Sequence, residues 1–176
     1  DENLINTAVD SLGEIGDEQA VEPLLNLFVA DSPIIYPISK ALSNIKSKKA
    51  VAPLIELLLE SEDKNIKRQS ATILGNIGDK SAIKPLIETL NDKDAYLRMR
   101  VVTALGQLND NEVIDPLLNA LNDNAAIVRN ASAGSLGEIG DEIYLEALEK
   151  LLNDKNENVQ KSAQNAIEKI KNKSKE

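Results

Sequence analysis

The sequence predicts an all-α fold of about eleven helices that stack as repeated pairs, and three observations lead to this prediction. The heptapeptide SLGEIGD occurs at Ser11–Asp17 and again at Ser135–Asp141, 124 residues apart, which is four steps of 31. Degraded copies start at the intermediate steps, at Ala41 (ALSNIKS), Ile73 (ILGNIGD) and Ala104 (ALGQLND). The apolar residues are mainly Leu, Ile, Val and Ala, and only three Tyr and one Phe are present. Such a period is typical of arrays in which neighbouring units bury the core between them.

The first helix of each repeat is marked by a proline and a leucine-rich pattern, PLLxLL. Prolines recur at steps of 30, 32 and 31, at Pro23, Pro53, Pro85 and Pro116, and Ala147 follows one period later. Proline is tolerated in an opening turn because the amide donor that it lacks is unpaired there. The preceding aspartates are the expected N-caps of these helices: Asp17, Asp79, Asp110 and Asp141.

The second helix of each repeat follows the pattern VRxxAAxALGxIG. The spacing of Val128, Ser132, Leu136 and Ile139 places these side chains on one helical face. Glycine inside a helix costs about 1 kcal/mol, so its recurrence indicates close packing; it recurs at Gly13, Gly75, Gly106 and Gly137. Left-handed C-caps are expected at Gly16, Gly78, Asn109 and Gly140.

The predicted organisation is one repeat array over residues 1–171, followed by a polar tail. The array begins with the second helix of an incomplete repeat at 4–16 and continues with repeats at about 17–46, 47–78, 79–109, 110–140 and 141–171, before the tail at 172–176. Because helix 4–16 lacks a first helix, we expect Leu4, Ala8, Leu12 and Ile15 to be covered on one side only. We therefore expect further repeats, a capping domain, a partner or self-association at this end.

Composition narrows the possible functions. The formal net charge of −9 argues against wrapping nucleic acid, whose affinity comes largely from Lys and Arg on phosphates. The chain has no Cys and no His, which removes the thiolate and imidazole groups used by most catalytic and metal sites. The longest apolar runs are far shorter than the roughly 20 residues that span a bilayer. We expect a soluble cytoplasmic protein that is not an enzyme, with no catalytic residue, metal or cofactor and no membrane or nucleic-acid partner.

The repeat resembles the HEAT-repeat superfamily, specifically the short HEAT-like repeats of phycobilisome (PBS) lyases, over nearly all of residues 4–170. The resemblance is carried by the prolines, the ALGxIGD motif, the turn aspartates Asp92, Asp123 and Asp154, and the pairs Ile66-Lys67, Leu97-Arg98 and Val128-Arg129. It implies a right-handed α-α superhelix whose second helices line a concave, protein-binding face. Ile34-Ile35 and Lys46 depart from the pattern.

All four arginines fall near the start of a second helix, where the helix dipole disfavours cations. Arg98 and Arg129 each follow an aspartate, Asp92 and Asp123, by six residues. The resemblance implies that this Asp–Arg pairing braces the turn between the two helices of a repeat. We predict that these four residues form a structural ladder.

Arg68 and Arg100 fall outside that ladder, and we predict that they face the concave surface. The predicted partner-binding residues, in helical register, are Tyr36, Lys40, Arg68, Thr72, Asn76, Met99, Arg100 and Gln107. Arg, Tyr and Met are enriched at protein interfaces. The alternative is a solvated face that happens to hold several cations.

The leading functional hypothesis is therefore a non-catalytic scaffold that holds a partner, with an acidic segment in its concave groove. The alternative is an accessory subunit or chaperone in cofactor or chromophore attachment, which the PBS-lyase resemblance suggests. A di-iron hydroxylase on the same scaffold would need His-Glu motifs, and the sequence contains no His.

Overall fold

A computed structural model describes residues 2–29 and 34–173 of the chain, and within them the protein is built of eleven α-helices without a strand. They are α1 (Glu2–Ile15), α2 (Val21–Val29), α3 (Ile35–Ile45), α4 (Val51–Glu60), α5 (Lys64–Ile77), α6 (Ile83–Thr89), α7 (Ala95–Leu108), α8 (Ile114–Ala120), α9 (Ala126–Ile139), α10 (Leu145–Lys150) and α11 (Glu157–Lys173). The predicted all-α stack of helix pairs is confirmed.

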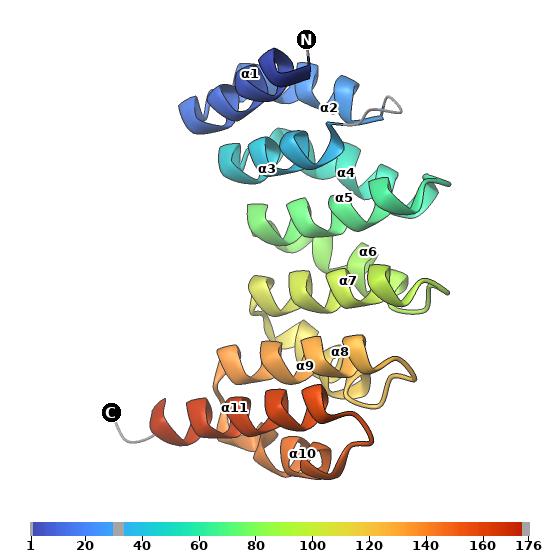
Figure 1. The fold of residues 1–176 in the computed structure, drawn as a ribbon, viewed down its shortest axis with the longest axis vertical. Coiled ribbons are helices and arrows are strands. Elements are labelled where there is room, and N and C mark those ends of the chain that lie inside the picture. Colours follow the sequence, from blue (N-terminus) through green and yellow to red (C-terminus); the bar gives the residue numbers. More distant parts are fainter. Residues whose placement is uncertain (1, 30–33, 174–176) are drawn as a thin grey trace.

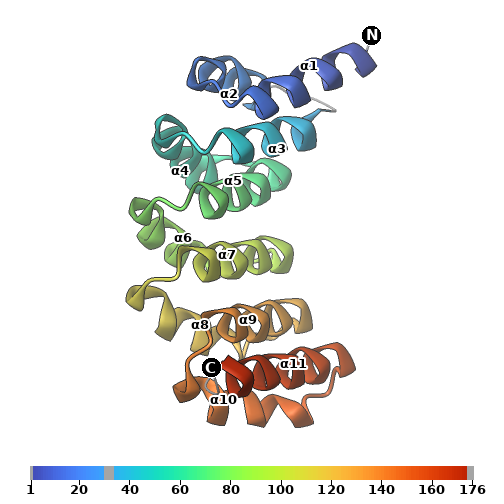
Figure 2. The ribbon, with the colours of Figure 1, turned by 90° about the vertical axis from the view of Figure 1, so that its left-hand side faces the viewer.

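The helices form two parallel rows. The second helices α1, α3, α5, α7, α9 and α11 lie one above the other, and the first helices α2, α4, α6, α8 and α10 lie behind them (Figure 1). Seen from the side, the stack is bowed, and the row of second helices lies on its inner, concave side (Figure 2). Each second helix packs on the next one in the row, so the core runs along the stack between the rows.

Each first helix is preceded by a short 3-10 turn, which the sequence did not predict. The turns are η1 (Glu18–Ala20), η2 (Lys48–Ala50), η3 (Lys80–Ala82), η4 (Asn111–Val113) and η5 (Glu142–Tyr144), and a sixth, η6 (Leu151–Asn153), follows α10. The residue before each of η1 to η5 caps it by accepting the N–H two residues on: Asp17, Ser47, Asp79, Asp110 and Asp141. The cap satisfies an orphan donor of the tight turn, and the α-helix then starts just before the proline or its Ala147 equivalent.

Second helices α3, α5, α7 and α9 end in a left-handed residue, as does the link from α1 to η1. Gly16, Gly78, Asn109 and Gly140 adopt this conformation as predicted. Lys46 replaces the glycine in the equivalent position and still has a φ of 51°. A left-handed non-glycine residue costs roughly 1–2 kcal/mol, so the stacking of repeats imposes the turn there against local preference.

Glycines in the second helices let neighbouring helices approach closely. A β-carbon at Gly75 would lie 2.7 Å from the Cα of Ala104 on the next second helix, and one at Gly137 would lie 2.8 Å from the Cα of Ala166. Real β-carbons do not approach backbone this closely. The spacing of the stack is therefore set where these helices cross.

The first helix of the array is only partly covered. Leu4 and Ile15 of α1 are 70% and 72% exposed, and Leu12 is 36% exposed. Leu136 occupies the same position as Leu12 in the second copy of SLGEIGD and is fully buried. At the other end α11 runs to Lys173, and the last three residues of the predicted tail lie outside the described residues.

No helix in the described part of the chain has both the length and the apolar character needed to cross a membrane.

Candidate protein-binding site

The concave row has an unusual charge distribution for an acidic protein. The helices α3, α5 and α7 contain no Asp or Glu at all, whereas the whole chain has 29. They carry six cations, Lys40, Lys64, Lys67, Arg68, Arg98 and Arg100. Which of these are available to a partner depends on the contacts that each makes.

Arg98 is a structural residue, and its carboxylate partner differs from the prediction. Its Nε and Nη2 donate to the two carboxylate oxygens of Asp123, both at 2.8 Å, and Arg98 is only 8% exposed. The predicted partner Asp92, six residues earlier, offers only its main-chain oxygen, at 2.7 Å. The expected pairing of side chains within one repeat was therefore wrong, because the bidentate bond joins Arg98 to the turn of the next repeat.

The same contact recurs along the stack. Arg129 donates to both carboxylate oxygens of Asp154 at 2.7 Å and to the main-chain oxygen of Asp123 at 2.8 Å. Lys67 stands in this position one repeat earlier, with its Nζ 3.9 Å from Asp92. In α11 the position is taken by Gln160, which keeps the main-chain bond to Asp154 at 2.6 Å. The cations of this ladder are thus engaged in joining repeats.

The ion pairs of the ladder shift the pKa values of the residues that form them. The bond to Asp123 raises the pKa of Arg98, and the bond to Asp154 raises that of Arg129. Burial by itself raises the pKa of Asp123, but the bonds from Arg98 and from the amide of Ala125 outweigh burial and hold it below the ordinary value. Both members of each pair therefore stay charged at neutral pH.

Arg68 was predicted to face a partner, but the structure ties it to the next repeat. Its Nε and Nη2 both lie 2.6 Å from Oδ2 of Asp94, the N-cap of α7. The guanidinium also lies over the ring of Tyr96, with Cζ 5.2 Å from the ring centroid. Arg68 thus neutralises a carboxylate beside the concave row and presents little free charge.

Other predicted residues also form contacts within the row. Lys40 of α3 pairs with Asp10 of α1 at 2.8 Å, and both side chains remain largely exposed. Asn76 of α5 donates to Ser43 at 3.0 Å and accepts from Gln107 of α7 at 3.1 Å. These polar side chains thus link neighbouring second helices through an ion pair and hydrogen bonds.

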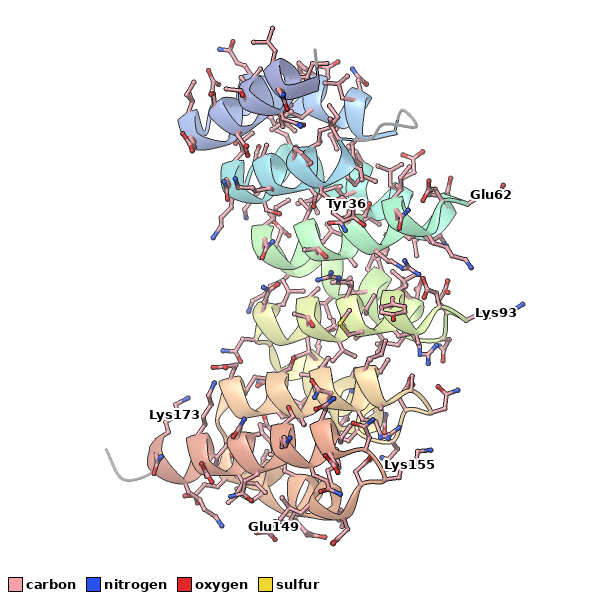
Figure 3. All side chains as sticks on the ribbon, viewed as in Figure 1. Tyr36, Glu62, Lys93, Glu149, Lys155 and Lys173 are labelled. Carbon is pink, nitrogen blue, oxygen red and sulfur yellow. The ribbon has the colours of Figure 1, made fainter. Side chains whose placement is uncertain are left out.

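Tyr36, Thr72 and Arg100 complete the predicted set. Tyr36 projects from α3 and is 59% exposed (Figure 3). The hydroxyl of Thr72 donates to the carbonyl of Arg68, one helical turn earlier, at 3.0 Å. Arg100 is exposed and takes part in no ion pair within the described part of the chain. Of the two arginines predicted to bind a partner, Arg100 is the one with a free guanidinium.

Met99, the last residue of the predicted set, lines a hollow that was not predicted from the sequence. This hollow of about 540 Å³ lies where the N-terminal parts of α9 and α11 meet Met99 of α7. We call it the α9–α11 hollow; it is lined by Met99, Ala126, Ile127, Asn130, Ala131, Asn156, Asn158, Lys161, Ser162 and Asn165. None of these described residues is acidic. Asn130 and Lys161 stand one and two repeat periods beyond Met99, and Asn165 stands three periods beyond Thr72, so an extended alignment would have found them.

Comparison with protein families gives the fold a name. A family model described as HEAT repeats matches residues 37–95, 51–137 and 114–175, which together cover well over half of the chain. The chain is a HEAT-repeat protein. A second model, PBS lyase HEAT-like repeat, matches residues 6–29 at the opposite end. The predicted family is confirmed.

Solved structures share the fold of this HEAT-repeat protein at low identity. The CpcE–CpcF complex of phycocyanin lyase from Nostoc sp. PCC7120 has a TM-score of 0.68 at 22% identity, over 86% of this chain and 65% of that one. Human deoxyhypusine hydroxylase, in complex with glycerol, has a TM-score of 0.61 at 23% identity, over 95% of this chain and 67% of that one. The HEAT-repeat protein thus spans about two thirds of each of these chains.

A designed armadillo repeat protein in complex with the peptide (KR)4 has a TM-score of 0.61 at 22% identity, over 97% of this chain and 94% of that one. No curated protein sequence matches the HEAT-repeat protein.

Proposed function

We propose that this HEAT-repeat protein is a non-catalytic interaction scaffold that binds an acidic segment of a partner protein along its concave row of second helices. The observation that carries the proposal is the absence of any carboxylate from three consecutive helices of that row, α3, α5 and α7. Three neighbouring helices that carry cations and no acid of their own suit a negatively charged partner, because complementary charge steers association and suppresses wrong partners.

The net charge of −9 does not oppose this proposal at physiological salt. Screening reduces the effect of charges farther than about 8 Å at 0.15 M, so a bound segment responds chiefly to the side chains beside it. A basic segment such as (KR)4, which the designed armadillo repeat protein binds, would find no carboxylate on α3, α5 or α7. The middle of the concave row, at α3, α5 and α7, therefore favours the opposite charge.

The test is fluorescence anisotropy with two labelled peptides, hexaglutamate and hexalysine, at about 0.15 M salt. We expect hexaglutamate to bind more tightly, and we expect Arg100→Glu to weaken its binding about fivefold. The matched control is Lys84→Glu, which makes the same charge change at an exposed residue of α6 in the outer row of the same repeat. Tighter binding of hexalysine, or equal effects of the two substitutions, would contradict the proposal.

The second proposed function, help in attaching a cofactor or chromophore, is favoured by the PBS-lyase-type repeat at residues 6–29. The measurement that separates the two is absorption spectroscopy during titration with a linear tetrapyrrole. The chain has no Cys or His and only four aromatic residues to hold a tetrapyrrole, so we expect no change in the visible spectrum. A saturable spectral shift would favour the second function.

A further inference from the structure

We propose that the α9–α11 hollow holds one acidic residue of the bound segment, whose carboxylate accepts hydrogen bonds from Lys161 and Asn156 while its main-chain N–H donates to Asn130. The proposal rests on the function proposed above, because it names the place on the concave row where the acidic segment is anchored. It also names the residue type, Asp or Glu, that occupies this place.

The hydrogen bonds already made around the hollow decide what it can still offer a ligand. Oδ1 of Asn156 accepts the amides of Asn158 and Val159 at 3.0 and 3.4 Å, which leaves the Nδ2 of Asn156 as a donor. Nδ2 of Asn130 donates to the main-chain oxygen of Asn158 at 3.0 Å, which leaves the Oδ1 of Asn130 as an acceptor. The two asparagines therefore present complementary groups, as a peptide requires.

Lys161 supplies the charge. It is exposed on α11 and takes part in no ion pair within the described part of the chain. On the same row, Lys40 is paired with Asp10, Arg129 with Asp154 and Lys169 with Glu138. Lys161 is therefore, like Arg100 of α7, a cation of the described second helices whose charge no carboxylate neutralises. An ionised carboxylate is an acceptor-only group, and a lysine ammonium is a donor-only group, so Lys161 and Asn156 select a carboxylate.

The apolar part of the hollow fits the rest of such a residue. Ile127 is 37% exposed at the start of α9, and Met99, Ala126 and Ala131 are partly buried around it. Aliphatic carbons of a Glu or Asp side chain can pack on these residues while the carboxylate stays beside Lys161. A volume of about 540 Å³ is within the range of specific ligand sites, so a single residue with its flanking peptide groups has room there.

The inference is tested by NMR titration of the ¹⁵N-labelled protein with acetyl-hexaglutamate amide, with acetyl-hexaglutamine amide as the neutral probe, at about 0.15 M salt. The expected result is that hexaglutamate shifts the side-chain amide signals of Asn130 and Asn156, and that Lys161→Glu weakens its binding about fivefold. The matched control is Lys150→Glu on α10, an exposed lysine of the outer row, which we expect to change the affinity less than twofold.

The outcomes separate this inference from the proposed function. If Lys161→Glu binds hexaglutamate as tightly as the wild type and the shifts centre on α3, α5 and α7, the hollow is not the anchor but the acidic-segment function stands. If neither peptide binds, or if hexaglutamine binds equally well, both proposals are overturned. Shifts confined to the first helices α2, α4, α6, α8 and α10 would likewise overturn both.

Discussion

The two copies of SLGEIGD provide an internal test of how burial, rather than sequence, determines stability. Leu136 in the second copy is fully buried between the rows, and Leu12 in the first copy is 36% exposed on the open side of α1. The perturbation is the same in both places, Leu136→Ala and Leu12→Ala. Because the neighbouring sequence is identical, intrinsic helix propensity is altered equally in both.

The expected magnitudes follow from the packing around each leucine. Leu136→Ala removes a fully buried side chain and leaves a cavity, so we expect it to lower the free energy of unfolding by about 3 kcal/mol. Leu12 borders solvent, so no enclosed cavity forms and only the transfer term of its buried part is lost, about 1 kcal/mol. The difference between the two variants is therefore about 2 kcal/mol.

The assay is urea unfolding followed by circular dichroism at 222 nm, together with hydrogen exchange resolved along the chain. Exchange is needed because repeat arrays can unfold in parts, and a Leu12 variant is expected to open α1 before the rest. Equal losses for the two variants would show that burial of the leucine does not set its contribution to stability. A loss for Leu12→Ala that grows with protein concentration would show that a second copy covers α1 in solution.

Three further outcomes follow from the same structure. Arg98→Met leaves the mostly buried Asp123 carboxylate without its cationic partner and with only the amide of Ala125, and we expect urea unfolding to show a loss of about 3 kcal/mol. Gly75→Ala gains helix propensity but places a β-carbon 2.7 Å from the backbone of Ala104, so we expect a net lower melting temperature. The amide of Ser81 and the bond from Lys48 lower the pKa of Asp79 to about 2, so thermal melts should show stability that is present above about pH 4 and falls as the pH drops toward 2. Asp79→Asn should reduce that slope, and with no His in the chain we expect little change between pH 5 and 8.

The fold could be predicted from the sequence to a large extent because its determinants are local and repeated. The helix C-caps at Gly16, Gly78, Asn109 and Gly140 satisfy carbonyls within one turn, and their recurrence marks the period. At Lys46 the sequence lacks the glycine that favours a left-handed C-cap, yet the residue adopts this conformation, which the stacking of repeats imposes. The 3-10 turns were missed because an Asp or Ser cap looks the same in sequence before a 3-10 turn and before an α-helix.

The candidate site was predicted less well, because its properties depend on which side chains meet between repeats. The interface-type residues Arg68 and Arg100 looked equivalent in sequence, yet Arg68 is bound by Asp94 and Arg100 is exposed. The hollow around Lys161 was missed because its lining comes from three helices and from the turn before α11. The groups that it offers a ligand also depend on hydrogen bonds that Asn130 and Asn156 make only in the folded chain.

Local sequence accounts for the helical repeat, its period, its caps and the glycines where helices cross, since each follows from hydrogen bonds and spacings within a few residues. The stacked fold, in contrast, is needed to establish that Arg98 binds the carboxylate of Asp123 rather than that of Asp92, and that Leu136 is buried while Leu12 is partly exposed. Stacking sets the distance and angle between repeats, and these determine which of two aspartates a guanidinium reaches and which leucine has a neighbour.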